Sequence, residues 1–388
     1  MTSRRDFLKL AALFSTAGSL PLLQACGRRA EQQPDAPLTI GYLPITDATP
    51  LLVAHARGLF AEQGIQVAKP VLFRSWASLV EAFLSGQVNL IHLLSPMSIW
   101  ARYGSGSPIK VVMWNHMAGS ALTVAPDVRR IADLSGRTVA IPFWYSIHNV
   151  VLQQLLRAEG LQVVERTPQP GEVRLAVMAP ADMVAALAAG TVAGFIVAEP
   201  FNAAAETKGV GRVLRFSGDV WRDHACCVTL MQERDIQTRP QWVQGVVNAL
   251  VDAQAFAAEH RRETAALLAK SGPNRYTPHE AAVLEQVLAP SDAAWARYRE
   301  QGIIRHPEWA QKRIDFQPYP FPSYTEALVA MLKQTHIAGV NRFLDTLDPA
   351  FAARDLVDDR FVRSAIERGG HRERFGLSGW TRQEVIAV

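Results

Sequence analysis

The segment RTVAIPFWYSIHN, residues 137–149, decides the fold. Its aliphatic start predicts a strand over 138–141, and the residues that follow predict a helix over 149–159. In an open α/β sheet, ligands bind beyond the carboxyl ends of the strands, close to helix starts. The free N–H groups and partial positive charge of a helix start favour a small anion. The segment therefore predicts an α/β fold with an anion site at this turn.

The same alternation of strand and helix extends on both sides of this segment. Further strands are predicted over 38–43, 67–73, 88–94, 109–114, 173–177 and 194–197, and further helices over 50–60, 77–84 and 180–189. This order predicts a mostly parallel sheet with helices on its faces. Beyond about residue 236 only helices are predicted, over 242–270, 278–287, 324–335 and 340–346.

The composition is that of an ordinary globular protein. The 388 residues are 49% apolar and 20% charged, with a formal net charge of +4. Residues 1–25 carry a net +2 of that charge, from Arg4, Arg5, Lys9 and Asp6. The nearly neutral remainder gives no support for a nucleic acid or an acidic surface as partner. Its length exceeds what one core usually supports, so two lobes are expected.

The N-terminal residues have the features of a removable export signal. SRRDFLK (residues 3–9) contains twin arginines, and the apolar stretch 10–23 is too short for a membrane-spanning helix. The twin arginines resemble the signal read by the Tat translocon. LQAC (residues 23–26) resembles a lipobox, which predicts cleavage after residue 25 and a lipid on Cys26. The alternative is ordinary cleavage with Cys26 unmodified. Residues 26–37 are polar and predict a flexible tether.

Several short motifs resemble those of a known family. They are GYLP (41–44), DATP (47–50), GLFAEQG (58–64), GQVNL (86–90), SPM (95–97), SIHN (146–149), APADM (179–183), EPFN (199–202) and WRDH (221–224). In this order they are similar to extracytoplasmic solute-binding proteins, in the branch that serves nitrate, bicarbonate, sulfonate and taurine ABC importers. The resemblance covers about residues 38–230, and the C-terminal third matches only in its helical character.

The resemblance implies a periplasmic-binding-protein fold of type II, with two α/β lobes, a hinged cleft and a helical C-terminal extension. Lobe 1 is expected to begin with 38–120 and to be completed by 226–388, and lobe 2 is expected over 121–225. The implied function is capture of a small anion, nitrate-like, bicarbonate or sulfonate, and its delivery to an ABC permease and its ATPase. The resemblance also implies a periplasmic monomer without enzymatic activity, cofactor or metal.

Five residues are predicted to bind the ligand: Trp76, Ser120, Ser146, His148 and Glu199. Trp76 would offer an indole N–H and a flat wall, although a buried Trp also serves packing alone. Ser146 and His148 would add hydrogen-bond donors at the helix start, unless Ser146 only caps the helix and His148 only packs there. A carboxylate facing an anion is repulsive, so Glu199 is expected to organise a hinge or helix start more than to touch the ligand.

The sequence departs from the family at residues 225–227. Relatives continue after the WRDH-like motif with P-E-K, whose lysine can pair with the anion, whereas this chain has Ala225-Cys226-Cys227. The missing cation favours a softer or uncharged ligand, or another cation such as Arg74 in its place. The two cysteines could bind a metal with His224, but adjacent cysteines at a strand start are more often small buried residues. No metal site is therefore predicted.

Two other functions use related folds. The pyrimidine-precursor synthase of thiamine biosynthesis is an enzyme, but its N-H-C-F-C region and reactive lysine have no counterpart around His224 in this sequence. A cytoplasmic ligand sensor would bind a regulatory protein, which the export signal argues against. The sequence also lacks the motifs G-x-S-x-G, G-x-x-x-x-G-K-[ST], H-E-x-x-H and C-x-x-C, so it predicts no catalytic site of those classes.

Overall fold

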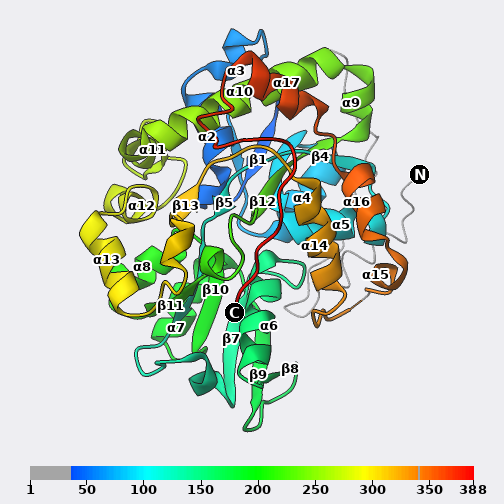
Figure 1. The fold of residues 1–388 in the computed structure, drawn as a ribbon. Coiled ribbons are helices and arrows are strands. Elements are labelled where there is room, and N and C mark those ends of the chain that lie inside the picture. The colour runs from blue at the N-terminus through cyan, green and yellow to red at the C-terminus, as the bar shows by residue number, and fades with distance from the viewer. Residues whose placement is uncertain (1–35, 340) are drawn as a thin grey trace, which may run out of the picture.

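The computed structural model describes residues 36–339 and 341–388, which form two α/β lobes stacked one above the other (Figure 1). The predicted signal 1–25, the predicted lipidation site Cys26 and most of the predicted tether lie outside the described residues. No helix among the described residues is long and apolar enough to cross a membrane.

Lobe 1, the upper part of Figure 1, is built on a five-stranded sheet of order β2-β1-β3-β12-β4. The strands are β1 (Ile40–Tyr42), β2 (Val71–Leu72), β3 (Leu90–Leu94), β4 (Ile109–Trp114) and β12 (Cys227–Gln232). β1 pairs in parallel with β2 and β3, whereas β12 runs antiparallel between β3 and β4. The sequence did not predict β12, which is the strand that the chain forms on its return from lobe 2.

Helices follow the strands of lobe 1, but the sequence predicted only those over 50–60 and 77–84. The helices are the 3-10 helix η1 (Thr46–Ala48), α2 (Thr49–Ala56), α3 (Leu59–Glu62), α4 (Trp76–Leu84), α5 (Ser95–Ile99) and the π-helix η2 (Trp100–Gly104). The single helix predicted over 50–60 is broken into α2 and α3 at Gly58, whose φ of 72° lies in the left-handed region. Glycine adopts this conformation without steric cost, so the chain turns there.

Lobe 2, the lower part of Figure 1, has a six-stranded sheet of order β11-β6-β10-β7-β9-β8. The elements are β6 (Ser120–Val124), the 3-10 helix η3 (Ile131–Leu134), β7 (Arg137–Ile141), α6 (Ile147–Ala158), β8 (Gln162–Val164), β9 (Glu172–Val177), α7 (Pro180–Ala188), β10 (Gly194–Ala198), α8 (Phe201–Thr207) and β11 (Arg212–Phe216). Strands β10, β7, β9 and β8 are parallel to one another, as expected of an α/β sheet, whereas β6 runs antiparallel to both of its neighbours.

The chain crosses between the lobes twice, and the two crossing segments lie side by side. The first crossing, residues 115–119, contains β5 (Met117–Ala118), and the second, residues 217–226, begins with the 3-10 helix η4 (Ser217–Asp219). An isolated antiparallel bridge joins Met117 to Ala225, and β13 (Ile314–Asp315) pairs with β5. We refer to these paired connecting segments as the hinge region.

The C-terminal third covers lobe 1 with helices. They are α9 (Glu233–Thr238), α10 (Pro240–Glu259), α11 (Arg261–Leu268), α12 (Ala281–Leu288), α13 (Asp292–Glu300), the 3-10 helix η5 (Pro307–Trp309), α14 (Pro322–Leu332), α15 (Phe343–Thr346), α16 (Pro349–Leu356) and α17 (Arg360–Arg368). The helix predicted over 242–270 is divided at His260, whose backbone is not helical (φ −108°, ψ 50°). The sequence did not predict α13, α16 or α17.

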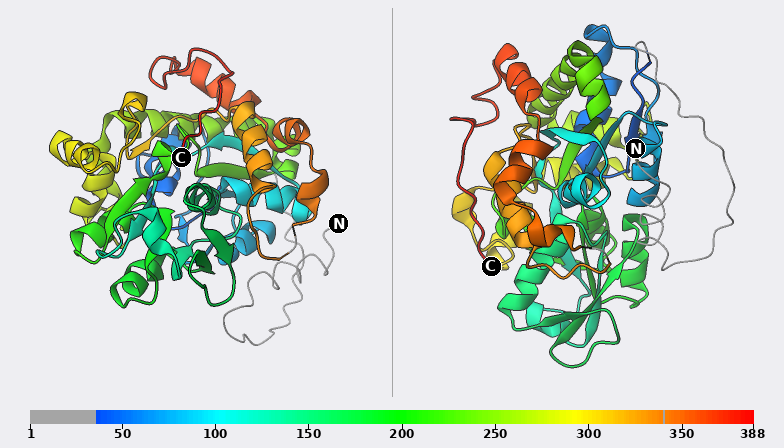
Figure 2. Two further views of the ribbon diagram at one scale, coloured as in Figure 1. Left: turned by 60° about the horizontal axis from the view of Figure 1, so that its bottom comes forward. Right: turned by 90° about the vertical axis from the view of Figure 1, so that its right-hand side faces the viewer.

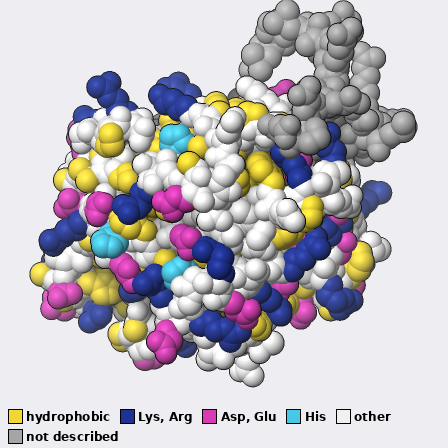
Figure 3. Space-filling view, turned by 90° about the horizontal axis from the view of Figure 1, so that it is seen from above, with side chains coloured by type: hydrophobic (Ala, Val, Ile, Leu, Met, Phe, Trp, Pro, Cys, Tyr) yellow, Lys and Arg dark blue, Asp and Glu magenta, His cyan; other side chains and the backbone are white. Residues whose placement is uncertain are grey.

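The end of the chain ties the helical region to the hinge. It runs down one side of the molecule to the level where the lobes meet (Figure 2). There Ile386 forms a β-bridge with Trp221 of the second crossing, and the Trp221 indole Nε1 donates to Glu384 over 2.8 Å. On the face seen from above, Lys and Arg side chains are interspersed with Asp and Glu (Figure 3). That face therefore offers no surface of a single charge sign.

The two lobes are closed against each other. Apolar side chains of both lobes belong to one continuous core. Trp100 of lobe 1, for example, has its ring 6.1 Å from the ring of Tyr145 in lobe 2. Polar side chains at the same level are consequently shielded from water.

Candidate functional site

A cluster of buried polar side chains lies where the two lobes meet. Its members are no more than 3% exposed and carry imidazole, thiol, hydroxyl, indole or carboxylate groups: Asp47, Trp76, His92, His116, Ser120, His148, His224, Cys226 and Cys227. Most of them come from lobe 1 or from the crossing segments, and His148 comes from α6 of lobe 2. Such a concentration of polar groups in an interior is costly unless the groups are paired or have a ligand.

Strand ends place these groups. Asp47 lies in η1, the first helix after β1, and Trp76 is the first residue of α4, the first helix after β2. His116 lies in the first crossing segment, and Cys226 and Cys227 stand where β12 begins. This is the edge of the lobe 1 sheet at which an α/β fold binds its ligands.

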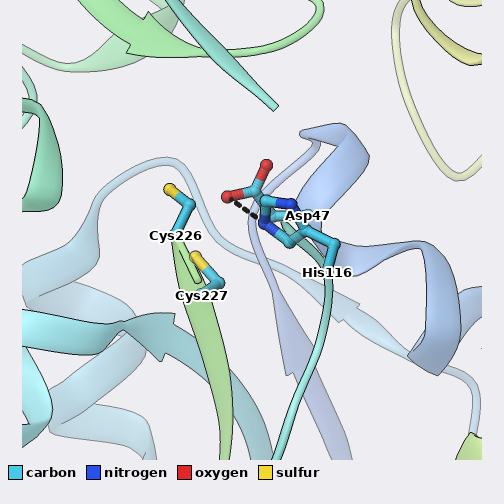
Figure 4. A group of neighbouring side chains, drawn as sticks. All are labelled: Asp47, His116, Cys226 and Cys227. Carbon is cyan, nitrogen blue, oxygen red and sulfur yellow. Dashed lines mark ion pairs between the residues drawn. The ribbon is translucent and has the colours of Figure 1, made fainter. Parts of the chain in front are cut away.

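Asp47 and His116 form a buried ion pair. Oδ2 of Asp47 lies 3.0 Å from Nε2 of His116, and neither side chain is exposed (Figure 4). Burial raises the pKa of Asp47 to about 6. Burial alone would lower the pKa of His116, but the Asp47 carboxylate outweighs it and raises that pKa to about 10. At neutral pH the pair is therefore ionised, and it contributes no net charge to the cluster.

Two other buried imidazoles of this region, those of His92 and His224, are neutral. Burial lowers the pKa of His92 to about 3 and that of His224 to about 4. The Leu43 amide donates to Nε2 of His92 over 3.0 Å, and Nε2 of His224 lies 2.9 Å from Oγ of Ser217. The Nδ1 atoms of both rings have no hydrogen-bond partner in the described part of the chain.

Two of the residues predicted from the sequence, Ser120 and His148, are brought together. Oγ of Ser120 lies 2.9 Å from Nε2 of His148, which links the start of β6 to α6. Sγ of Cys226 lies 3.7 Å from that oxygen and 3.8 Å from that nitrogen. The other ring nitrogen of His148, Nδ1, is buried and unpaired within the described residues. His148 can thus offer a hydrogen bond to a ligand without breaking its contact with Ser120.

Trp76 is also part of this cluster. Its ring packs edge-to-face on the ring of His92, with 5.5 Å between the ring centres. Its indole Nε1 is buried and has no acceptor among the described residues. A buried indole N–H normally finds a partner, so the structure leaves here a donor that a ligand could use.

Ser146 has the arrangement of a helix cap. Its hydroxyl donates to the carbonyl oxygen of Phe143 over 2.7 Å and accepts from the backbone N–H of Asn149 over 3.1 Å. Its only proton is therefore committed to the turn before α6. This is the capping alternative that the sequence left open, and it gives Ser146 no donor for a ligand in this structure.

Glu199 is paired with an arginine that the sequence did not single out. Oε1 of Glu199 lies 2.6 Å from Nε of Arg313, and both side chains are buried. Oε2 accepts from the backbone N–H of Ala203 in the first turn of α8 over 3.2 Å. The carbonyl oxygen of Glu199 accepts from the backbone N–H of Thr46 in lobe 1 over 3.0 Å. Glu199 thus connects a helix start, the hinge and lobe 1, and its carboxylate faces a cation of the protein.

A cavity of about 380 Å³ opens between the lobes. No member of the cluster lines it, but Ile45 and Arg74 of its lining stand two residues before Asp47 and Trp76 in the chain. Lobe 1 lines it with Leu43, Pro44, Ile45, Leu72 and Arg74, lobe 2 with Pro180, Ala181 and Phe201, and the C-terminal region with Lys270, Arg275, Thr277 and Pro278. The lining contains three cations and no acidic residue.

Arg74 of this cavity is the cation that the sequence offered as a replacement for the family lysine. It precedes Trp76 by two residues and has no ion pair with another described residue. Lys270 is paired with Glu280, whereas Arg275 also has no ion pair in the described part. The start of α7, at Pro180 and Ala181, lies in the same wall and brings the partial positive charge of a helix N-terminus to it.

The sequence analysis missed several residues of this region. Asp47 stood inside a quoted motif, but its approach to His116 depends on the long-range packing of η1 against the first crossing. His92 lies in a buried strand, where a single histidine does not by itself indicate a binding site. Lys270 and Arg275 come from a loop about 200 residues away in the chain from Arg74, so only the tertiary fold brings them near it.

A larger cavity, of about 710 Å³, lies between α8, α12 and α13. Its lining mixes acids and bases, among them Glu206, Arg212, Glu285 and Arg297. It is not at the carboxyl ends of the lobe 1 strands and lacks Arg74; like the smaller cavity, it is lined by none of the five predicted ligand residues.

Comparison with known proteins agrees with this architecture. The sequence pattern of the NMT1-like family matches residues 31–271. The nitrate/nitrite binding protein NrtA of Nostoc sp. is 25% identical over 308 residues, which cover 74% of this chain and 67% of NrtA. The bicarbonate transport ATP-binding protein CmpC of Synechocystis sp. is 28% identical over 252 residues, 60% of this chain.

A solved structure has the same fold. The crystal structure of the periplasmic nitrate-binding protein NrtA from Synechocystis superposes with a TM-score of 0.72 at 17% identity, over 90% of this chain and 93% of that one. The lengths of the sequence relatives differ from that of this chain. The match spans about two thirds of the Nostoc NrtA but only 37% of CmpC.

Proposed function

We propose that this chain, which belongs to the NMT1-like family, is the solute-binding component of an ABC importer and captures a small anion between its two lobes. The observation that carries the proposal is the cavity between the lobes, whose lining has three cations and no acid. The names of the relatives, a nitrate/nitrite binding protein and a bicarbonate transport protein, agree with this class of ligand.

The charge distribution selects for an anion. Arg74 and Arg275 are exposed side chains without an ion pair in the described part of the chain, so their charge is available to a solute. A concave wall of one charge sign raises the local concentration of oppositely charged solutes. The start of α7 adds partial positive charge on the lobe 2 side. Nitrate, bicarbonate and short sulfonates are small enough for a cavity of about 380 Å³.

Donors deeper in the lobe interface would complete the site. The indole N–H of Trp76 comes from lobe 1 and Nδ1 of His148 from lobe 2, and both are buried without a partner among the described residues. A solute that reaches both contacts would bind the closed form more tightly than the open form. Such differential affinity is what drives closure of two lobes around a ligand.

The remaining parts of the proposal concern location and partners. The Tat-type signal at 1–25 would export the folded protein to the periplasm, and a lipid on Cys26 would hold it at the membrane through the 26–37 tether. An anchored binding protein stays at a high local concentration near its permease and ATPase. The protein acts there as a monomer and leaves its ligand chemically unchanged.

A thermal-shift screen of the purified protein tests the proposal. The panel contains nitrate, nitrite, bicarbonate, cyanate and short alkanesulfonates, with sodium chloride at equal ionic strength as control. A ligand at 100 times its Kd stabilises the folded state by about 2.7 kcal/mol, so at least one anion should raise the midpoint. If no anion raises it while a neutral heterocycle does, the anion assignment is wrong.

A further inference from the structure

Four metal-ligating side chains converge at the base of the lobe interface. They are Asp47, His116, Cys226 and Cys227, and one ligand atom of each lies within 4.8 Å of every other. All four side chains are buried. Figure 4 shows them approaching one another from three separate segments: the turn after β1, the first crossing and the start of β12.

We propose that these four side chains hold one tetrahedral metal ion of the zinc class, which fastens the two crossing segments to lobe 1. This goes beyond the proposed solute-binding function, because the ion would be a permanent part of the hinge. The sequence analysis predicted no metal site, and the alternative that it weighed used His224 as the third ligand. In the structure His224 turns to Ser217 instead, and Asp47 and His116 complete the set.

The donor set points to this class of metal. Two thiolates, one imidazole and one carboxylate are a combination of soft and borderline ligands that suits Zn²⁺ and excludes Mg²⁺ and Ca²⁺, which prefer oxygen alone. Four protein ligands leave no open position, as in structural zinc sites.

The distances also fit an ion with little rearrangement. Bonds of about 2.0–2.3 Å in a tetrahedral site separate the ligand atoms by roughly 3.3–3.8 Å. The ligand atoms here lie within 4.8 Å of one another, and Asp47 Oδ2 and His116 Nε2 are 3.0 Å apart. Shifts of about 1 Å or less would therefore bring all four into bonding positions.

An unsatisfied buried carboxylate is the second, independent observation. Oδ1 of Asp47 has no hydrogen-bond partner in the described residues, although the side chain is completely buried. A buried carboxylate with a free oxygen is costly, and a cation between Asp47 and the two sulfurs would satisfy it.

The position of the site explains what the ion would do. The four ligands belong to lobe 1 and the crossing segments, whereas His148 of lobe 2 stands 3.8 Å from Sγ of Cys226. The ion would thus hold together the lobe 1 side of the interface, and it would have no ligand from lobe 2. A hinge fastened in this way keeps the two crossing segments in register while the lobes open and close.

The test uses Co²⁺ as a spectroscopic substitute on the purified full chain. Metal is removed with chelator under reducing conditions, in a Cys26→Ser background that leaves only the two cluster thiols. Addition of Co²⁺ should produce thiolate-to-metal charge-transfer absorption that saturates at one ion per chain. Zn²⁺ should abolish that absorption by displacement and protect both thiols from alkylation.

Matched variants identify the ligands. Cys227→Ser and His116→Gln should each weaken Co²⁺ binding by at least about 100-fold, because even partners that only orient a ligand are worth about 10–100-fold. His224→Gln, a change at a neighbouring buried imidazole outside the set, should leave binding within a few-fold of the parent. Asp47→Asn keeps the shape of the side chain and should also weaken Co²⁺ binding. It replaces Cys227→Ser in the test if that variant does not fold.

Two outcomes would overturn the proposal. One is equal alkylation of the thiols with and without Zn²⁺, together with no charge-transfer band from Co²⁺. The other is loss of binding in His224→Gln with retention in His116→Gln and Asp47→Asn, which would move the site elsewhere. Neither outcome depends on the anion screen, so the metal site and the solute site succeed or fail separately.

Discussion

Replacement of Arg313 by methionine should destabilise the protein more than replacement of its partner Glu199 by glutamine. The two side chains form a buried ion pair with a 2.6 Å contact. In Arg313→Met the Glu199 carboxylate stays buried and keeps only the backbone N–H of Ala203. An uncompensated buried charge of this kind costs about 3–5 kcal/mol.

Glu199→Gln leaves a different situation, because Arg313 retains other partners. Glu206 lies 3.3 Å from its Nη2, and the hydroxyl of Tyr298 lies 3.0 Å from its Nη1. The glutamine oxygen can still accept from Nε. The stability cost of Glu199→Gln is then the difference between a charge-assisted and a neutral hydrogen bond, about 1–2 kcal/mol.

Urea denaturation of the two single variants and the double variant measures both costs. The double variant should be less destabilised than the sum of the single variants, because removal of both partners leaves no orphaned charge. Equal costs, or a larger cost for Glu199→Gln, would refute this account of the hinge. Circular dichroism of each variant at zero urea provides the folding control.

Three further predictions concern the lobe interface. Trp76→Phe and His148→Ala should each weaken anion binding by about 10- to 100-fold, the value of one hydrogen bond to a charged group, which calorimetry tests. Trp76→Phe breaks no hydrogen bond in the ligand-free protein, because the indole N–H is unpaired in the described structure, so its cost in urea denaturation should be limited to the lost packing of this buried ring. Ser146→Ala should lower the stability by about 0.5–2 kcal/mol, because a helix cap is lost, and leave the affinity for the anion unchanged. A large loss of affinity would show that Ser146 contacts the ligand. Because the pKa of His92 is lowered to about 3, the unfolded chain binds a proton there between about pH 4 and 6.5 that the folded chain does not, so His92 contributes a rise in stability of about 1.4 kcal/mol per pH unit. His224, whose pKa is also lowered, adds to this slope, and Asp47, whose pKa is raised, opposes it. The slope in chelator should therefore be smaller in His92→Gln than in the parent by this amount, and equal slopes would contradict the assignment.

Local patterns in the sequence were enough to predict most elements of the two sheets. Residues 109–114 and 173–177 were expected as strands, and the structure has β4 at Ile109–Trp114 and β9 at Glu172–Val177. The resemblance to solute-binding proteins is confirmed by the family match and by the shared fold. Strands β6, β8, β11 and β12 were not predicted from the sequence. β6 and β12 each follow an irregular crossing, and the mixed direction of the sheets depends on where those crossings end.

The site was harder to predict than the fold. Ser120 and His148 were singled out separately, and only the fold places them 2.9 Å apart. The metal-ligating group joins residues 47, 116 and 226–227, a spacing that no local motif describes. Burial and pairing of single charged residues, such as Arg313, are likewise consequences of tertiary packing.

The location of the solute site is the central claim, and calorimetric titration of two arginine variants tests it most directly. The anion that gives the largest thermal shift is titrated into the parent protein, into Arg74→Gln in the cavity between the lobes, and into Arg297→Gln in the larger cavity. Arg74→Gln should raise the Kd by about 10- to 100-fold, and Arg297→Gln should bind like the parent. A parent-like Kd for Arg74→Gln, with weakened binding for Arg297→Gln, would place the solute outside the cleft and contradict the account.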